Sequence, residues 1–228
     1  MAVLAPSPRV SDALRWLARR KTTVVSLFVG VCAPLMLFGM FADDVLDKER
    51  FVFDLPIQMF VHGHASPAMD QLMILLSQIG SAWFAVPFDA LVTVVLLWRK
   101  QHRHAAFWLA AVGGSAALNL LAKQAFSRVR PALWVSPAPE TTFSFPSGHA
   151  MQTAAIVAGL TILLWRTRWR IPMLVFGSLF VWSVGVSRIY LGVHYPSDVV
   201  AAWAASIGWV VGLSMALRVN ADGAFLES

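Results

Sequence analysis

Long runs without a charged residue constrain this chain more than any other feature of its sequence. The first run, residues 22–42, holds 21 residues without Asp, Glu, Lys or Arg. About 20 apolar residues in a helix cross the core of a bilayer, whereas the apolar part of a cleaved signal peptide holds roughly 7–15. We therefore expect an uncleaved transmembrane helix here. Composition agrees, because 58% of the residues are hydrophobic and 13% are charged, against about 25% charged residues in soluble domains.

Five more apolar runs follow, so the sequence predicts an all-α, polytopic membrane bundle with six transmembrane helices. After 22–42, the expected spans cover about residues 72–98, 105–122, 148–165, 171–186 and 199–217. We expect a single membrane domain over 1–228, divided into a basic cytoplasmic N-terminus at 1–21, a six-helix core at 22–217 and a short cytoplasmic tail at 218–228.

Polar residues interrupt this pattern at two places. Residues 51–61 mix apolar side chains with Asp54 and Gln58, and this short segment is expected to form an interfacial helix on the extracytoplasmic face of the membrane. Asp89 is the only charge in the second span, where an ionisable group is costly. We expect it to form a hydrogen bond between helices, with a direct role as the alternative. Pro87 in the same span predicts a kink.

Basic residues indicate which side of the membrane each end of the spans faces. Lys and Arg cluster in the N-terminal segment, at 99–103, at 166–170 and at Arg218. Six spans place all these clusters on one side, and cytoplasmic loops are enriched in Lys and Arg. We therefore expect a multi-pass protein of the cytoplasmic (inner) membrane with both termini in the cytoplasm. This topology also explains the net charge of +6 without a nucleic-acid partner.

Several cations break this rule by falling on the extracytoplasmic side, namely Lys123, Arg128, Arg130 and Arg188. An anionic ligand is the simplest reason for cations on that side. Lys123 and Arg130 are seven residues apart, which is two helical turns if the third span continues to Pro131. Arginine offers a planar fork that matches phosphate oxygens, and lysine adds a point charge. These residues predict a phosphate-binding site.

The turn at 145–149, with the sequence Phe-Pro-Ser-Gly-His, supplies further groups for such a site. Ser147 is a good N-cap, and Gly148 removes side-chain bulk beside the backbone. A helix that begins here directs free N–H groups and the positive end of its dipole outward, which suits an anion. The Ser147 hydroxyl and the Gly148 N–H can hydrogen-bond the anion, and His149 can donate or accept a proton. An ordinary capped helix with a surface histidine is the alternative.

His194 and Asp198 complete a catalytic arrangement. Asp198 follows four residues after His194, near the start of the last expected helix. A carboxylate there can accept from one imidazole nitrogen and leave the other as a lone-pair nucleophile. With His149 to protonate the leaving oxygen, phosphoryl transfer needs no metal. Asp198 can also cap the helix N-terminus, which is the structural alternative.

Three motifs, in this order, resemble the signature of the type 2 phosphatidic acid phosphatase superfamily. They are Lys-x6-Arg-Pro at 123–131, Pro-Ser-Gly-His at 146–149 and Ser-Arg-x5-His-x3-Asp at 187–198. The resemblance implies that His194 is the nucleophile of a phosphohistidine intermediate, that Asp198 orients it and that His149 is the general acid. It implies no metal and no other cofactor, and it implies phosphate binding by Lys123, Arg130, Ser147, Gly148 and Arg188.

The expected function is metal-independent hydrolysis of a lipid phosphomonoester or diphosphate by a membrane-embedded enzyme whose active site faces the extracytoplasmic side. Substrates of the resembled family include phosphatidylglycerol phosphate, phosphatidic acid and undecaprenyl diphosphate, and the sequence does not choose among them. The substrate would come from the bilayer, and the sequence does not indicate an oligomeric state. The alternatives are a lipid phosphotransferase using the same site, a membrane transporter with a basic vestibule and a vanadium-dependent haloperoxidase.

Overall fold

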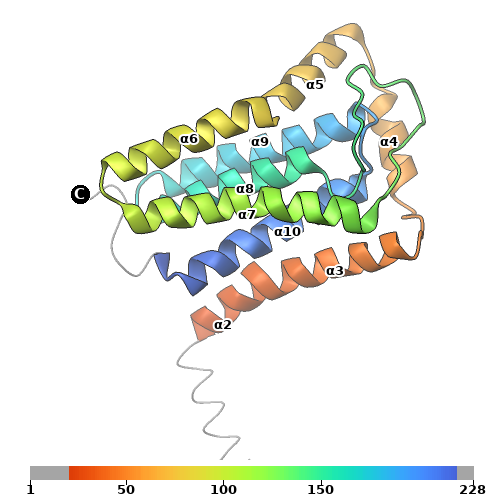
Figure 1. Cartoon of the computed structure of the whole chain (residues 1–228). Coiled ribbons are helices and arrows are strands. Elements are labelled where there is room, and N and C mark those ends of the chain that lie inside the picture. Colours follow the sequence, from red (N-terminus) through yellow and green to blue (C-terminus); the bar gives the residue numbers. More distant parts are fainter. Residues whose placement is uncertain (1–20, 220–228) are drawn as a thin grey trace, which may run out of the picture.

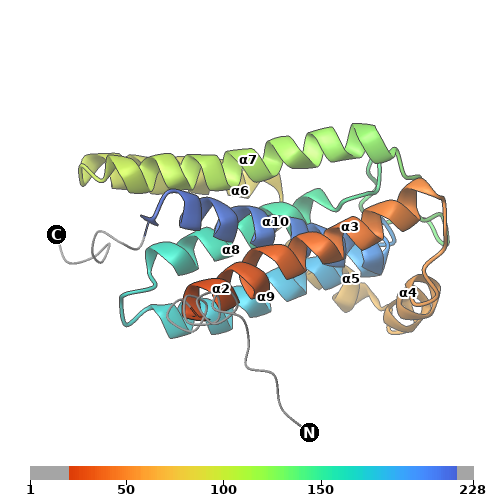
Figure 2. The same ribbon diagram turned by 90° about the horizontal axis from the view of Figure 1, so that it is seen from below.

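All regular structure in residues 21–219, the part of the chain described by the computed structural model, is helical. This agrees with the all-α class expected from the apolar runs. Most helices lie side by side in one bundle, and α4 runs across its end (Figure 1, Figure 2). The bounds are α2 Lys21–Leu27, the π-helix η1 Phe28–Cys32, α3 Ala33–Leu46, α4 Asp54–His62, α5 Pro67–Ile79, α6 Ala82–Trp98, α7 His102–Phe126, α8 Gly148–Leu163, α9 Arg170–Tyr190 and α10 Pro196–Ala216.

Five helical stretches between residues 21 and 219 are long and apolar enough to cross a membrane. They are Thr23–Leu46, Pro67–Trp98, His102–Phe126, Arg170–Tyr190 and Pro196–Ala216. The remaining apolar helix, α8, has 16 residues, which is about 24 Å of helix against a hydrocarbon core of about 30 Å. The expected number of six spans is therefore not confirmed, because one of the expected spans is a short helix. The predicted cytoplasmic segments at 1–20 and 220–228 lie outside the described residues.

The first span is longer than the sequence predicted. Its helix continues to Leu46, so Asp43 and Asp44 belong to the end of α3 rather than to the connection that follows. A π-helical turn precedes α3, directly before Pro34. Proline cannot donate the backbone hydrogen bond of a regular helix, and a local change of helical register accommodates this loss.

The second predicted span consists of two helices. The break between α5 and α6 falls at Gly80 and Ser81, whereas Pro87 lies inside α6. The kink predicted at Pro87 stays a prediction, because the division of the span lies at another position. Gly80 packs against α9, where an added Cβ would lie 2.6 Å from Cγ1 of Val184. Tertiary packing thus decides the position of this break.

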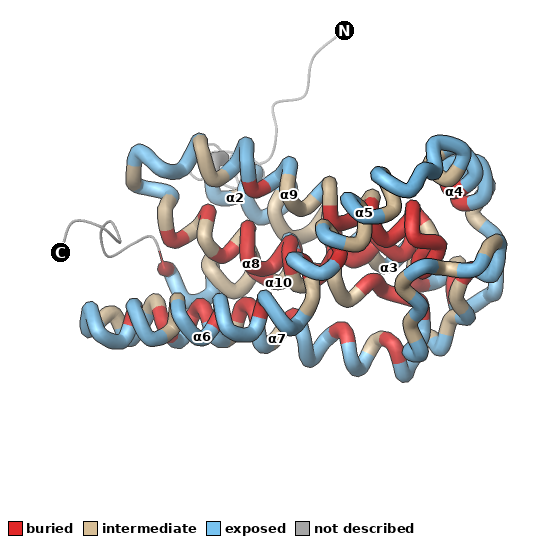
Figure 3. The backbone as a smooth tube through the Cα atoms, turned by 90° about the horizontal axis from the view of Figure 1, so that it is seen from above, coloured by how far each residue is buried: buried red, intermediate tan, exposed pale blue. Residues whose placement is uncertain are grey.

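The short helix α8 lies at the centre of the bundle. It packs against α7, α9 and α10, and α10 in turn packs against α3. Figure 3 shows the buried residues concentrated along α8 and the neighbouring part of α10, while the outer faces of the surrounding helices are exposed. Many exposed residues are large and apolar, such as Leu120 and Phe176, which suits contact with lipid. The bundle therefore buries its catalytic motifs and presents an apolar surface to the membrane.

The two ends of the bundle differ in charge. The α6–α7 and α8–α9 connections, which carry the basic clusters 99–103 and 166–170, meet at one end (Figure 1). The 127–147 loop and α4 meet at the opposite end (Figure 1). The predicted interfacial segment 51–61 corresponds to α4, whose polar residues Asp54 and Gln58 are buried. Because its apolar residues are largely exposed, α4 directs its polar face toward the protein.

Candidate active site

The 127–147 loop brings the first motif to the site. α7 ends at Phe126, and Ser127 adopts a left-handed conformation with φ of 45°. The expectation that this helix continues to Pro131 is therefore wrong, and Arg130 lies in the loop. Lys123 and Arg130 nevertheless meet, because Nζ of Lys123 and Nη2 of Arg130 donate to Oγ1 of Thr142 at 2.9 and 3.0 Å. The folded-back loop, rather than a helix, joins the two cations.

Arg130 connects the loop to the C-terminal motif. Its Nε donates to the Thr142 carbonyl at 2.6 Å, and its Nη1 donates to the Val193 carbonyl at 2.6 Å. Nη1 also lies 3.1 Å from Nε2 of His194. Since guanidinium is only a donor, this contact assigns the lone pair of His194 to Nε2.

His194 is fully buried between this arginine and Asp198. Its Nδ1 lies 3.4 Å from Oδ2 of Asp198, and its backbone carbonyl accepts from Gln58 of α4 at 3.3 Å. Burial lowers the pKa of His194 to about 4, an effect that Asp198 partly opposes. At neutral pH the ring is therefore uncharged, with Nδ1–H toward the carboxylate and the lone pair of Nε2 toward Arg130.

The carboxylate of Asp198 accepts hydrogen bonds from several groups. It accepts from the backbone N–H of Tyr195 at 2.9 Å, from Ser144 Oγ and from Arg128 Nη1. The first bond caps α10, while the contact with His194 orients the imidazole. The capping interpretation of Asp198 is therefore confirmed, and its contact with His194 is compatible with the predicted orienting role.

Arg128 and Asp54 form a second buried layer that sequence reasoning missed. Nη2 of Arg128 donates to Oδ2 of Asp54 at 3.1 Å, and the guanidinium lies 4.1 Å from the centre of the Tyr195 ring. Asp54 also accepts from the backbone N–H of Ser197 at 2.8 Å. Burial raises the pKa of Asp54, and the bonds from Ser197 and Arg128 oppose that rise. The available signal was the position of Arg128 among the cations on the extracytoplasmic side.

Glu140 lies at the centre of the cations and was also missed. It forms ion pairs with Arg188 and, at 2.8 Å, with Arg130, and its Oε1 lies 3.7 Å from Nδ1 of His149. Burial alone would raise the pKa of Glu140, but Arg188 and, after it, His194, His149 and Arg130 outweigh burial and hold this pKa at about 2. A carboxylate thus occupies the place that these side chains provide for an anion.

Two buried donors beside Glu140 have no hydrogen-bond partner among the described residues. They are Nε of Arg188 and Oγ of Ser147. Ser147 occupies the N-cap position of α8, yet its side chain makes no capping hydrogen bond, so that part of the expectation is wrong. Gly148 packs closely against Asn119, where a Cβ would lie 3.1 Å from Oδ1. All eight predicted site residues therefore lie at one end of the bundle. Among them, Nε of Arg188 and Oγ of Ser147 have no hydrogen-bond partner in the described part of the chain.

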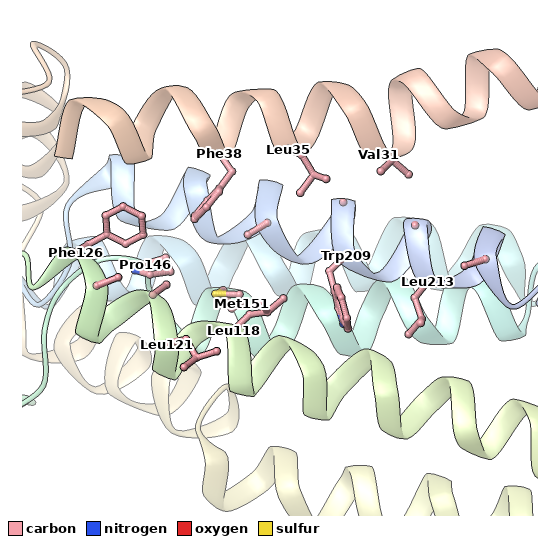
Figure 4. A pocket seen from close by; sticks show the side chains of 16 residues that line it. Val31, Leu35, Phe38, Leu118, Leu121, Phe126, Pro146, Met151, Trp209 and Leu213 are labelled. Carbon is pink, nitrogen blue, oxygen red and sulfur yellow. The ribbon is translucent and has the colours of Figure 1, made fainter. Parts of the chain in front are cut away.

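Two grooves lead away from this end. The first, of about 680 Å³, lies between α3, α7 and α10 and is lined by apolar side chains that include Phe38, Trp209 and Met151 (Figure 4). The second, of about 710 Å³, lies between α6, α7 and α8 and is lined in part by Gly148 and His149. Only this second groove therefore includes a predicted catalytic residue in its wall.

The histidines at 62 and 64 lie apart from this cluster. His62 stacks on Trp134 with ring centres 3.8 Å apart, and Nδ1 of His64 lies 2.9 Å from the Phe60 carbonyl. Within residues 21–219, no group of three or more His, Cys, Asp or Glu side chains is placed to hold a metal ion.

Known proteins show the same combination of sequence and fold. A family model described as the PAP2 superfamily matches residues 104–222. The undecaprenyl-diphosphatase of Sulfolobus acidocaldarius is 29% identical over 174 residues, which cover 75% of this chain and 81% of that protein. Phosphatidylglycerophosphatase B of Bacillus subtilis is 25% identical over 146 residues, covering 62% and 71%. The crystal structure of a transmembrane PAP2-type phosphatidylglycerolphosphate phosphatase from Bacillus subtilis matches with a TM-score of 0.71, at 22% identity, over 83% of this chain and 97% of that one.

Proposed function

The chain belongs to the PAP2 superfamily, and on that premise we propose that it hydrolyses a phosphate monoester or diphosphate of a membrane lipid. The strongest support for this proposal is the position of His194. The uncharged, buried His194 lies between Asp198 and Arg130, directly beside a cluster of cations that holds an internal carboxylate. A phosphoryl group bound in place of that carboxylate would face the free electron pair of Nε2.

The reaction then proceeds in two steps. Nε2 of His194 attacks phosphorus, forming the N–P bond as the bond from phosphorus to the lipid oxygen breaks, and His149 gives a proton to that oxygen. Burial and Arg188 lower the pKa of His149 to about 3, so in this proposal the proton arrives with the phosphate group and passes through His149. Water then attacks the phosphohistidine and gives a proton to His149; the N–P bond breaks, phosphate is released with that proton and both imidazoles return to their starting state. Asp198 holds the Nδ1–H and stabilises the positive charge that develops on the ring. Neither step requires a metal ion or another cofactor.

The cations stabilise the charge on the transferring group. Arg130 and Arg188 present guanidinium forks, Lys123 adds a point charge, and Oγ of Ser147 and the N–H of Gly148 supply hydrogen bonds. These groups are fixed before substrate arrives, because Lys123 and Arg130 are held by the loop at Thr142. Preorganised donors of this kind supply most of the catalysis in phosphoryl transfer.

The substrate reaches the site from the bilayer. The groove between α6, α7 and α8 is largely apolar and ends at His149, so it suits a lipid chain whose headgroup enters the cluster. The basic connections lie at the opposite end of the bundle, and this supports a site on the extracytoplasmic side of the inner membrane. Intact cells should then hydrolyse a membrane-impermeant phosphate analogue added outside. Hydrolysis seen only after lysis would contradict this orientation.

The central test replaces the nucleophile. His194→Ala should lower phosphate release from lipid phosphates in detergent by about a thousandfold or more, because no other group can form the intermediate. The matched control is His64→Ala, which removes a histidine outside the cluster and should retain wild-type turnover. A chelator should leave the wild-type rate unchanged, and acid quenching during turnover should trap less protein-bound, acid-labile phosphate in the variant. Retained turnover by a folded His194→Ala protein would disprove the mechanism.

A further inference from the structure

The groove that ends at His149 contains one buried carboxylate that the proposed mechanism does not use. Asp89, on α6, lines this groove together with Gln152 of α8. Oδ2 of Asp89 accepts from Nε2 of Gln152 at 2.7 Å, which confirms the hydrogen bond between helices expected from the sequence. Asp89 is only 9% exposed, so protein atoms of the groove wall surround most of this residue.

The second oxygen of Asp89 has no such partner. Oδ1 is buried and makes no hydrogen bond to any residue in the described range 21–219. None of the ion pairs found in that range includes Asp89. A buried polar atom without a partner costs free energy, and the cost is larger for a carboxylate at membrane depth. Oδ1 is therefore a buried acceptor without a partner, in a residue that lines the groove.

Two other polar residues of the groove use donor groups for hydrogen bonds within the protein. Oγ1 of Thr93 donates to the Asp89 carbonyl at 2.7 Å, and Nδ2 of Asn119 donates to the Pro146 carbonyl at 3.0 Å. The remaining lining is mostly Ala, Val, Leu and Gly. Asp89 thus supplies the buried carboxylate oxygen of this wall that has no partner among the described residues.

The position of the Asp89–Gln152 pair relative to His149 indicates which part of a bound lipid the pair would contact. Gln152 follows His149 by three residues on α8, a rise of about 4.5 Å along the helix. A lipid whose ester oxygen faces His149 would place the next carbons of its alcohol beside this pair. The nearby cations Lys123, Arg130 and Arg188 disfavour a second positive group there, so a neutral donor fits better than an ammonium.

We propose that Asp89, held by Gln152, binds a hydroxyl group on the leaving alcohol of the lipid substrate, close to the phosphate ester. This inference rests on the proposed phosphatase activity and narrows its substrate class. Phosphatidylglycerol phosphate carries such a hydroxyl on the glycerol that bears the terminal phosphate. Phosphatidic acid, whose other hydroxyls are esterified, and undecaprenyl diphosphate do not. Asp89 thus favours phosphates of hydroxylated alcohols over these two lipids.

The test compares two lipids that differ in one hydroxyl. A monoacylglycerol phosphate and the matched acyl-propanediol phosphate, which lacks only the free hydroxyl, are hydrolysed in detergent micelles by the full-length protein. For the wild type we expect kcat/KM about tenfold higher for the hydroxylated lipid, the discrimination expected from one hydrogen bond to a charged group. Asp89→Leu should lower kcat/KM for that lipid alone and bring the ratio close to one.

Thr93→Val is the matched control, because it removes a hydroxyl from the same groove whose hydrogen bond is internal to α6. It should keep the wild-type ratio. Retained hydrolysis of the propanediol lipid by Asp89→Leu shows that this variant is folded. A wild-type ratio near one, or an equal fall for both lipids in Asp89→Leu, would overturn the hydroxyl site while leaving the phosphatase proposal intact. Absence of hydrolysis of either lipid by the wild type would overturn both.

Discussion

Two buried carboxylates illustrate how the polar end of the bundle differs from its middle. Asp198, at the polar end, accepts from Tyr195, Ser144, Arg128 and His194. Asp89, in the middle, accepts from Gln152 alone. In a low-dielectric interior, charge is stable only where donors surround it. The polar end is therefore preorganised, whereas the middle contains a carboxylate oxygen without a partner among the described residues.

The two regions also differ in what holds their helices together. At the polar end, side-chain ion pairs join α4, the 127–147 loop and α10. In the middle, small residues let helices approach, as at Gly114 of α7, where a Cβ would lie 2.5 Å from Cζ2 of Trp209 on α10. Changes at the polar end should therefore affect turnover most, and changes in the middle should affect stability.

Arg128→Met, at the polar end, is expected to have the largest effect on turnover of the changes that distinguish the polar end from the middle of the bundle. The side chain keeps its approximate length but leaves Asp54 and Asp198 without their shared cation. We expect kcat to fall about a hundredfold with little change in KM, because Arg128 orients Asp198 and does not belong to the phosphate-binding set. Steady-state kinetics on a lipid phosphate measures both constants.

The matched control for that change is Arg50→Met, which removes an exposed arginine near the same end and should behave as wild type. A rise in KM at unchanged kcat would show instead that Arg128 binds substrate. Thermal unfolding of the same samples separates a catalytic loss from a loss of folded protein.

A smaller effect is expected for Glu140→Gln, which removes the internal anion from between Arg130 and Arg188. Inorganic phosphate would no longer compete with a carboxylate for the two arginines. The inhibition constant of phosphate should therefore fall about tenfold, an effect comparable to that of one charge-assisted hydrogen bond. Competition assays with phosphate or vanadate provide the measurement. Glu49→Gln, an exposed change outside the site, is the control. Weaker inhibition in Glu140→Gln would show that Glu140 helps to bind the anion rather than occupying its place.

The smallest effect is expected in the middle of the bundle, from Gly114→Ala. Overpacking against Trp209 should cost about 1–3 kcal/mol, and for a chain of this size each kcal/mol lowers Tm by about 2–4 °C. Gly113→Ala is an adjacent control, because a Cβ there meets nothing within 4 Å. Thermal unfolding in detergent compares the two. Equal Tm values would show that α7 and α10 can separate at no cost.

Sequence patterns predicted most of the site because its residues belong to short motifs. The pairs Lys123/Arg130 and His194/Asp198 and the turn at 145–149 are each local in sequence, and their side chains meet as expected. Errors arose where local rules compete with packing. α7 ends before Arg130, Ser147 makes no capping bond, and the second expected span divides into two helices at Gly80 and Ser81.

The amino-acid sequence by itself determined that this protein lies in a membrane and which histidines, cations and carboxylate belong to the three motifs of the candidate site, since hydropathy and motif spacing are properties of the chain alone. Only the tertiary structure decided that Glu140 lies among the cations, that Arg128 joins Asp54 to Asp198 and that Asp89 meets Gln152. These contacts join residues 10 to 74 positions apart in sequence. No local period or spacing encodes such pairs, because they form only when the loop folds back and separate helices pack side by side.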